Sequence, residues 1–477
     1  MKRIFTILLL FLMTCLLVRA SDYYWTNSQP ASATYQAGDT VHLVGTFTGG
    51  ITITNSGTTV NPITFLFEPN AKFSVPTFSG VLIQCNQSNV VIDGGQNGII
   101  EATANGTGLA YSNDFAAIQI SGAFGVLVKN LLIQNLYVNV AGSDENGATA
   151  GIEIYNTCGN ITVTNCVIHD MKAGIWIAFG AGCSNILYSH CTAYNCNWGG
   201  GAGDTGSSST LNGLTVDHCH FYNWQNWDDN GDWDHHNGFY CWAGQGAGGL
   251  ASNVTYSANH VGPGYGAHNT AGLFISGNVD AILVFNNLFD ASDGSSPANA
   301  QLNVGLSSSS TTRIFNNTFI GAQGFDIGGG GGVSTSSFLA FNNEFYNCSF
   351  PIELWNNVTY TFWSDTNNFY SAAGNQQFNA SNNGNGAFYN FAGWQSYGGY
   401  GSPWDAHSTA SNPNLNNLYE PQANSPLLGA GVYNSLVAVD YNGVTRPNPP
   451  SIGAFEVATT NAPPQPICFT PFYRPTQ

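Results

Sequence analysis

The sequence has few charged residues, and basic ones are the scarcest. Of its 477 residues only 8% are charged, and 9 Lys and Arg stand against 27 Asp and Glu. Nucleic-acid binding depends on neutralising phosphates with Lys and Arg, so this composition argues against a nucleic-acid partner. An acidic polysaccharide would also be repelled, unless divalent cations bridged it to the protein.

Long apolar runs are lacking beyond the N-terminus. Lys2 and Arg3 precede an apolar run over residues 4–18, and Val18-Arg-Ala20 places a small residue at a cleavage position. The run is shorter than the ~20 residues that span a bilayer, so it predicts a signal peptide over residues 1–20. We therefore expect a secreted chain, extracellular or periplasmic, with no membrane association after cleavage.

Paired Cys-x-x-Cys motifs, which would indicate zinc, are absent although the chain has 11 cysteines. Cys166, Cys191 and Cys219 occupy one position of a repeat and are expected to stack in the core as small apolar residues. Cys158 and Cys183 are equivalent to each other on a turn. They are the better candidates for a disulfide in an oxidising compartment.

What the sequence does contain is a repeat with a period of about 25 residues. Each copy has an alternating apolar strand, an Asn or His, and a further apolar pair, as in residues 160–168. Further copies occupy residues 185–193, 213–221, 281–289, 312–319 and 339–345. One copy cannot bury its own apolar face, whereas stacked copies share a continuous core, so the pattern predicts a solenoid.

Each repeat divides into three short strands. The clearest copy has strands at residues 151–154, 161–164 and 166–169, and Asn165 alone makes the second bend. Three strands per coil, with a rise of about 4.8 Å between coils, describe a parallel β-helix. The predicted fold is therefore an all-β solenoid of about 10–13 coils.

The residue at the second bend recurs from coil to coil and is expected to form a hydrogen-bonded amide ladder. The predicted ladder residues are Asn165, Asn286, Asn316 and Asn342. His190 and His218 occupy the same position. They are therefore expected to be structural turn residues rather than catalytic ones.

These coils resemble right-handed parallel β-helix proteins of the pectate-lyase-like superfamily, of the secreted bacterial type. The similarity covers roughly residues 35–457 and extends to an ending, residues 440–446 and 452–456, that is similar to a closing segment of such proteins. It implies that Arg446 and Glu456 hold a cap together, because an open last coil would expose a sheet edge. Lyases, hydrolases, epimerases, adhesins and inert scaffolds share this fold, so the resemblance does not fix the activity.

The expected organisation has four parts. They are the signal peptide (residues 1–20), a β-helix with an N-terminal cap (21–372), a C-terminal coil and capping region (373–457) and a disordered tail (458–477).

Alternation decides which residues of the first strands face outward, one per coil. The predicted row is Gln119, Glu153, Trp176, Gly200, Tyr240, Phe274, Asn303, Asp326 and Glu353. An aromatic row on an outer sheet suits stacking on sugar rings, so Trp176, Tyr240 and Phe274, with Glu153 beside them, are predicted to bind substrate. The alternative is that long turns cover these rings.

The longest polar turn, residues 224–236, supplies most of the remaining candidates. They are Asp228, Asn230, Asp232, Trp233, Asp234, His235 and His236. In one interpretation Asp232, Asp234 and the two His do acid–base work on a glycosidic bond while Trp233 contacts substrate. In a second, the oxygens of Asp228, Asn230, Asp232 and Asp234 bind Ca²⁺. In a third, the turn is a solvated rim.

Two further candidates lie near the same face. Pectate lyases use an Arg or Lys base beside Ca²⁺, and Lys172 precedes Trp176. As a base it would need a lowered pKa, and the alternative is a solvated Lys. His268 and Tyr265, on the turn after the acidic one, form a candidate acid–base pair. Polygalacturonase-type motifs are absent.

The sequence therefore predicts a secreted, monomeric carbohydrate-active protein. It would cleave or modify a polysaccharide, as a lyase or glycoside hydrolase, in a groove along the first sheet, with Ca²⁺ as the candidate cofactor. The alternative is a non-catalytic polysaccharide-binding or surface-structural β-helix.

Overall fold

The computed structural model describes residues 20–32, 34–77, 80–104, 115–138, 149–180, 182–204, 208–227, 236–244, 249–266, 268–307, 309–328, 336–355, 361–380, 387–397 and 404–457. These residues contain 34 strands, with the 3₁₀-helices η1 (Gln225–Trp227) and η2 (Ser435–Val437) and one α-helix. No helix among them is long and apolar enough to cross a membrane.

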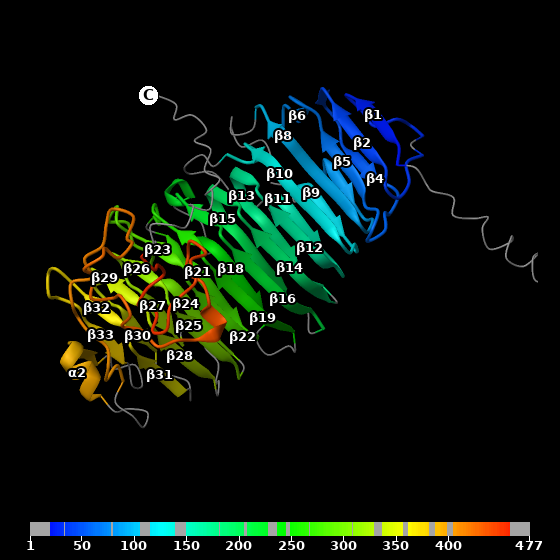
Figure 1. Cartoon of the computed structure of the whole chain (residues 1–477). Helices are drawn as coiled ribbons and strands as arrows, with labels where there is room; N and C mark the ends of the chain where they lie inside the picture. The colour runs from blue at the N-terminus through cyan, green and yellow to red at the C-terminus, as the bar shows by residue number, and fades with distance from the viewer. Residues whose placement is uncertain are drawn as a thin grey trace, which may run out of the picture.

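The strands wind into a parallel β-helix, as the repeat predicted (Figure 1). Strands of one coil pair in parallel with the equivalent strands of the next coil. Among the described strands, the one antiparallel pairing joins β33 (Phe378–Ala380) to β34 (Phe388–Tyr389), after the last coil. The coils therefore form three parallel sheets that run the length of the molecule.

The first sheet has 12 strands, within the predicted number of coils. They are β4 (Ile51–Ile53), β7 (Ile83–Cys85), β9 (Phe115–Ser121), β11 (Thr149–Tyr155), the ends of β13 (Val167–Ala178) and β15 (Thr192–Asp204), β18 (His236–Ala243), β21 (Asn269–Gly277), β24 (Ala300–Leu306), β27 (Phe325–Ile327), β30 (Ile352–Leu354) and β33.

The second sheet begins two coils earlier than the first. Its strands are β1 (Asp22–Thr26), β2 (Thr40–Val44), β5 (Ile63–Phe67), the starts of β8 (Val90–Ala102) and β10 (Val126–Gln134), β12 (Gly159–Thr164), β14 (Cys183–Ser189), β16 (Thr210–Asp217), β19 (Leu250–Ser257), β22 (Val279–Phe285), β25 (Thr311–Phe315), β28 (Ser337–Phe341) and β31 (Thr361–Asp365).

The third sheet follows the second bend of each coil. Its strands are β3 (Thr46–Phe47), β6 (Lys72–Val75), the ends of β8 and β10, the starts of β13 and β15, β17 (His220–Tyr222), β20 (His260–Val261), β23 (Leu288–Asp290), β26 (Thr318–Ile320), β29 (Glu344–Tyr346) and β32 (Asn368–Tyr370).

The inward side chains of the three sheets form one continuous core, from Trp25 in the first coil to Trp404 beyond the last. Like residues stack from coil to coil inside it. Phe289, Phe319 and Phe345, for example, lie in parallel planes with centroids 4.6 and 5.0 Å apart. Each added coil therefore lengthens the core, because its inward side chains pack on those of the neighbouring coils.

Residues with a left-handed backbone make the bend between the second and third sheets. Asn165, His190, His218, Asn286, Asn316 and Asn342 have φ between 49° and 59°. Asn and His adopt this conformation more readily than most residues other than Gly. The bend prediction is therefore confirmed, and both histidines lie at bends as predicted.

The main amide ladder, however, lies one residue later than predicted. It is formed by Asn259, Asn287, Asn317, Asn343 and Asn367, all buried, and each of the first four donates from Nδ2 to the Oδ1 of the next at 2.9–3.1 Å. A side chain on the left-handed residue leaves the coil, so the following residue is the one that turns inward. Among the predicted ladder residues, the structure shows one such bond, from Asn342 to Asn316 at 3.3 Å.

The cysteines of the repeat occupy the same inward row. Cys166, Cys191 and Cys219 are buried, as predicted, and the backbone N–H of Cys219 donates to Asn259 Oδ1 at 2.9 Å, where the row changes from thiols to amides. Cys158 and Cys183 are free thiols here, so the structure does not contain the predicted disulfide.

Aromatic residues close the last coil. Helix α2 (Phe391–Ser396) carries Trp394, which stacks on Phe378 with ring centroids 5.0 Å apart. Trp404 packs edge-on against Phe362 at 5.2 Å. These contacts cover the final coil, which would otherwise expose apolar side chains.

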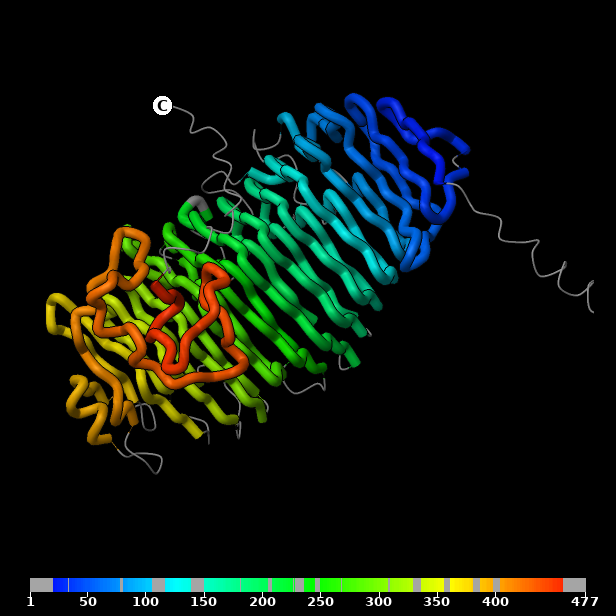
Figure 2. The backbone as a smooth tube through the Cα atoms, in the orientation of Figure 1, coloured from blue at the N-terminus to red at the C-terminus, as the bar shows by residue number. Residues whose placement is uncertain are grey.

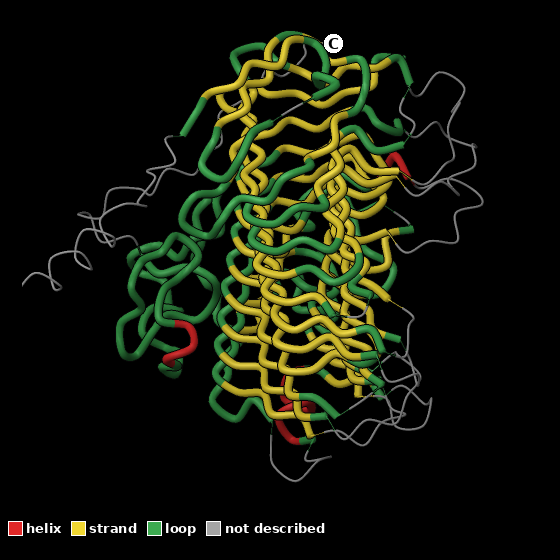
Figure 3. Tube along the Cα trace, turned by 90° about the vertical axis from the view of Figure 1, so that its right-hand side faces the viewer, coloured by secondary structure: helices red, strands yellow, loops and turns green. Residues whose placement is uncertain are grey.

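The chain then turns back along the outside of the solenoid (Figure 2). We call residues 409–457 the return segment, most of which is loop lying beside the stacked strands (Figure 3). The outward amides of the bends bind it: Asn342 Oδ1 accepts from the N–H of Val432 at 2.9 Å, and Asn286 Nδ2 donates to the carbonyl of Val439 at 2.7 Å. The predicted closing segment therefore clasps the side of the coils and does not cover their end.

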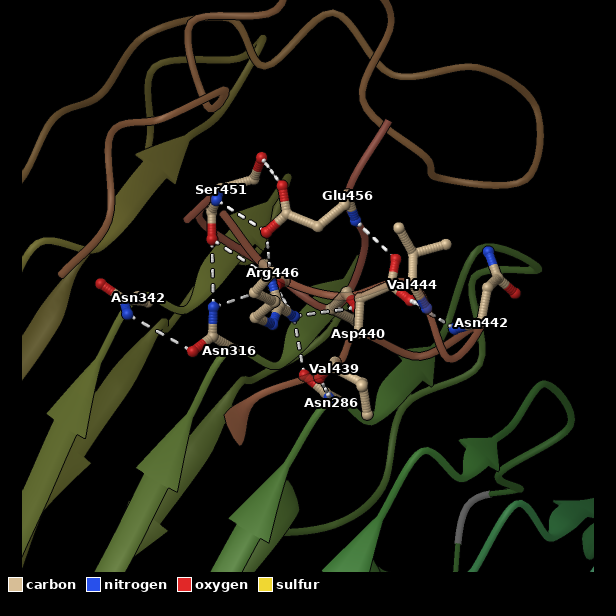
Figure 4. A network of polar contacts seen from close by, with 12 residues as sticks. Asn286, Asn316, Asn342, Val439, Asp440, Asn442, Val444, Arg446, Ser451 and Glu456 are labelled. Carbon is tan, nitrogen blue, oxygen red and sulfur yellow. Dashed lines mark hydrogen bonds and ion pairs between the residues drawn. The ribbon is translucent and has the colours of Figure 1, made fainter. Parts of the chain in front are cut away.

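Arg446 and Glu456 hold the return segment together, as predicted (Figure 4). Their side chains are 1% and 6% exposed, and Arg446 Nη1 donates to Glu456 Oε1 at 2.7 Å. Arg446 Nη2 also donates to Asn286 Oδ1 at 2.7 Å, which fixes the segment to the bend. This network is structural.

Candidate functional site

The outward face of the first sheet carries one residue per coil in a continuous row, which we call the outer row. Its members are Thr52, Gln84, Gln119, Glu153, Trp176, Gly201, Tyr240, Phe274, Asn303, Asp326, Glu353 and Asn379. This is the predicted row with one correction. Gly201, not Gly200, pairs with Trp176 and Tyr240.

The N-terminal part of the outer row is polar and hydrogen-bonded along the solenoid axis. Gln84 Nε2 donates to Gln119 Oε1 at 2.7 Å, and Gln119 Nε2 donates to Glu153 Oε2 at 2.6 Å. Glu153, predicted to bind substrate, is half-buried beside Trp176 of the next coil. Glu153 is therefore the last residue of the polar part of the row, and Trp176 is the first of the aromatic part.

Trp176 fills the space that the glycines leave. A Cβ atom on Gly201 would lie 2.6 Å from Trp176 Cζ3, so the indole lies directly over this glycine. Trp176 also stacks on Trp198, with ring centroids 5.1 Å apart. Trp176 is half-buried, and its predicted contact with substrate stays a prediction.

Lys172 lies against the same tryptophan pair. Its Nζ is 5.8 Å from the centroid of the Trp198 ring, a cation–π distance, and the residue is buried. The alternative of a solvated lysine is therefore wrong, whereas its predicted role as a base stays a prediction.

Tyr240 and Phe274 form the second aromatic pair of the outer row. Their rings stack with centroids 5.2 Å apart and planes 15° apart, and both residues are half-buried. Each ring uses one face on the other, so edges and outer faces are what remain for a sugar. Burial raises the pKa of Tyr240, so its hydroxyl stays protonated.

The C-terminal part of the outer row is acidic and more deeply buried. Asp326 and Glu353 pair directly in successive coils and are 4% and 8% exposed. Burial, and then the negative charge of Glu353, raise the pKa of Asp326 to about 8. Nearby Trp355 and Asn303 act in the opposite direction and lower that pKa. Burial also raises the pKa of Glu353. Asp326 therefore keeps its proton at neutral pH.

Amide side chains flank the two acids. Asn303 Nδ2 donates to Asp326 Oδ2 at 3.0 Å, and Asn379 Nδ2 donates to Glu353 Oε1 at 3.3 Å. Gln323 donates to the other Glu353 oxygen. Two buried acceptors, Asp326 Oδ1 and Asn379 Oδ1, have no hydrogen-bond partner among the described residues. Because Asp326 Oδ2 accepts from Asn303, the proton of the neutral carboxyl lies on Oδ1, which can donate to a ligand, whereas Asn379 Oδ1 can accept from one.

Most of the predicted acidic turn lies outside the described residues. This applies to Asp228, Asn230, Asp232, Trp233, Asp234 and His235. His236 is described, and it is fully buried at the start of β18.

The predicted His268–Tyr265 pair does not form at the surface. His268 is exposed, whereas Tyr265 is completely buried and donates its hydroxyl to the carbonyl of Val261 at 2.7 Å. Burial raises the pKa of Tyr265 well above its usual value. Tyr265 is therefore a core residue, and a role in proton transfer at the surface is wrong for it.

Sequence reasoning placed Asp326 and Glu353 on the outward face but did not select them. A signal was present, since two acids in consecutive coils are unusual in a chain with 8% charged residues. Their burial was the missing fact, because alternation tells which way a side chain points and not what lies around it.

No family model matches the chain, and no curated protein matches it. Solved structures do match. Pectate lyase Pel9A is 14% identical over 91% of this chain and 96% of its own, with a TM-score of 0.41. The PL6 family polysaccharide lyase Pedsa3628 from Pseudopedobacter saltans is 11% identical over 89% and 98%, with a TM-score of 0.46. A rhamnogalacturonan lyase is 12% identical over 92% and 97%, with a TM-score of 0.36.

Proposed function

We propose that this chain is an exported, monomeric enzyme that cleaves a polysaccharide laid along the outer row. The observation that supports the proposal most is the acid pair Asp326 and Glu353, buried in successive coils beside the aromatic part of the row. A catalytic acid has to hold a proton at neutral pH, and here the raised pKa of Asp326 coincides with a position on the outward face of the first sheet.

Asp326 is the proposed proton donor. A carboxyl with a pKa of about 8 holds a proton at neutral pH and can pass it to the oxygen of a departing sugar. Glu353, the neighbouring carboxylate, keeps that proton on Asp326, because two like charges one coil apart are unfavourable. Glu353 is also the proposed base or nucleophile of the second half of the reaction.

The aromatic part of the row is proposed to position the substrate. Phe274 pairs with Asn303, and Asn303 with Asp326, so the Tyr240–Phe274 pair ends two coils from the acid. At about 4.8 Å per coil this is roughly 10 Å along the solenoid. A chain that contacts the aromatic edges would extend over the acid pair.

Ca²⁺ binding is a second candidate role for the acidic part. Asp326 Oδ1 and Asn379 Oδ1 are buried acceptors without a partner among the described residues, and Ca²⁺ selects such carboxylate and amide oxygens. Asn303, Asp326, Glu353 and Asn379 would hold the ion, with both carboxyl groups ionised, so this role would replace that of Asp326 as proton donor. It would offset the negative charge of an acidic polysaccharide, which this acidic protein would otherwise repel. The predicted Ca²⁺ ligands of the turn, Asp228, Asn230, Asp232 and Asp234, remain a separate proposal.

The test is an activity panel on the purified mature chain. Neutral and acidic polysaccharides are incubated with Ca²⁺ or EDTA, and reducing ends and the ultraviolet absorbance of unsaturated products are followed together. Asp326→Asn is expected to lower the rate by about 10²–10⁴. Glu344→Gln is the matched control, because Glu344 is also a buried acid but belongs to the third sheet.

The outcomes separate the alternatives. Reducing ends alone indicate hydrolysis, and both signals together indicate elimination. Loss of activity in EDTA supports the Ca²⁺ role. Binding without any product in the wild type would replace the proposal by the non-catalytic polysaccharide-binding β-helix.

A further inference from the structure

Two successive bends differ from the others along the solenoid. Asn is the commonest residue at the left-handed position, and Ala258 and Thr366 also occur there, but here the position is occupied by His190 and His218. Asp217 precedes His218. We call these three residues the histidine bend. The fold needs a left-handed residue there, but it does not need imidazoles.

The side chains of the histidine bend converge. The two imidazoles stack with centroids 4.8 Å apart and planes 7° apart. Asp217 Oδ2 contacts His218 Nδ1 at 2.8 Å, and one ligand atom from each of the three residues lies within 4.8 Å of the others. Two ring nitrogens and one carboxylate oxygen thus surround a single point.

Neighbouring hydroxyls orient the carboxylate and one ring. Ser257 Oγ donates to Asp217 Oδ1 at 2.6 Å, which leaves Oδ2 directed at the histidines. Ser189 Oγ contacts His190 Nδ1 at 2.6 Å. Partners of this kind hold the ligands of metal sites in orientation.

The backbone beneath the cluster is rigid. Ser189 pairs with Asp217 between β14 and β16, and the N–H of His190 donates to the carbonyl of Asp217 at 2.9 Å. The cluster is also reachable, since both histidines are exposed and Asp217 is half-buried. On one side the ring of Tyr441, in the return segment, lies 6.4 Å from the ring of His218.

We propose that the histidine bend is a binding site for a divalent transition-metal ion of the Zn²⁺ class. Two imidazoles and one carboxylate are a ligand set that zinc accepts, with a water in the fourth position. Ca²⁺ prefers oxygen ligands alone, so this site differs in chemistry from the acidic part of the outer row. Zinc holds its ligands about 3.4 Å apart, so the three atoms, which lie within 4.8 Å of one another, must close by up to about 1.4 Å, through rotation of the exposed rings.

The test titrates untagged mature chain with Zn²⁺ alone, followed by calorimetry and by competition with a chromogenic chelator. One ion per chain is expected, and Ca²⁺ is not expected to compete. Co²⁺ in place of Zn²⁺ is expected to give the visible absorption of a site with low coordination number.

The decisive variant is His190→Asn combined with His218→Asn. Asn is the residue that other bends use, so the left-handed backbone is retained and the fold is checked by circular dichroism. Zn²⁺ affinity is expected to fall at least 100-fold. His407→Ala is the matched control, because His407 is an exposed histidine paired with one carboxylate, Asp365, at 2.6 Å. It is expected to leave Zn²⁺ binding unchanged.

Two results would overturn the proposal. One is wild-type protein that takes up no Zn²⁺ at micromolar concentration. The other is a folded double variant that binds Zn²⁺ as tightly as the wild type. Neither result depends on polysaccharide cleavage, so this proposal and the proposed function can fail separately.

Discussion

Replacing Arg446 by Ala tests how the return segment is attached. The substitution removes a guanidinium that is 1% exposed and leaves the Glu456 carboxylate, 6% exposed, without its counter-ion. It also removes the donor to Asn286 Oδ1 and the donors to the carbonyls of Gly453 and Ala454, at 2.7, 3.0 and 3.1 Å.

The expected cost follows from these contacts. Removing one partner of a buried ion pair costs about 3–5 kcal/mol, because the other charge stays buried and uncompensated. The N–H of Ser451 still donates to Glu456 Oε1 at 2.8 Å, which places the expected value near the lower end of that range. The lost stability should be confined to the return segment, because the amide ladder inside the coils does not contact Arg446.

Native-state hydrogen exchange is the assay, because it reports opening of single segments. The amides of Val432 and Ala454, which bind Asn342 Oδ1 and Thr318 Oγ1, should lose about 3 kcal/mol of protection. The ladder amide of Asn317 should keep its protection. Arg313→Ala, on the half-buried outer face of β25, is the matched control and should change little. A loss below about 1 kcal/mol at both amides would refute the argument, since it would be no larger than for an exposed pair.

Three further predictions concern the amide ladder, the aromatic part of the outer row and Glu344, a buried acid of the third sheet. Asn317→Ala should lower the free energy of unfolding by about 3 kcal/mol, measured by denaturant titration, because it leaves the buried backbone N–H of Asn287 without its acceptor and removes a donor to Asn343 Oδ1. Gly201→Ala should displace Trp176, seen as a change in indole fluorescence, and cost about 1–3 kcal/mol. Burial raises the pKa of Glu344 well above its usual value. The folded chain thus keeps a proton that the unfolded chain has lost, so stability should fall as pH rises above the unfolded pKa of about 4.3, and Glu344→Gln should flatten that fall.

Each of these has a result that contradicts it. For Asn317→Ala it is a loss under about 0.5 kcal/mol, the size expected of a surface change. For Gly201→Ala it is an unchanged fluorescence spectrum. For Glu344→Gln it is a stability profile between pH 5 and 8 with the same slope as that of the wild type.

The sequence predicted the fold well because every coil repeats the same physical problem. A three-strand coil with a bend at Asn165 follows from alternation and from the tolerance of Asn for a left-handed backbone. The predicted row failed only at Gly200. In a glycine run no side chain marks which residue faces outward, so Gly201 could not be told from its neighbour.

Other features depend on contacts that a linear pattern does not encode. Asn-Asn pairs such as Asn286-Asn287 offer two candidate residues for the ladder. The first residue has the left-handed φ and points out of the coil, so the second residue forms the ladder. The return segment has no periodicity that would place it along the side of the coils. Asp326 and Glu353 were predicted to face outward, but their burial, and hence their raised pKa values, depends on the surrounding coils.

The most direct test of the account is the pH dependence of kcat/KM for wild type and Asp326→Asn on whichever polysaccharide the panel identifies. If Asp326 is the proton donor, wild-type activity should fall as pH rises past about 8, where the Asp326 carboxyl ionises. The variant should be about 10²–10⁴ slower and should lack that alkaline limb. A variant that keeps the wild-type rate and the same alkaline limb would show that the chemistry lies elsewhere.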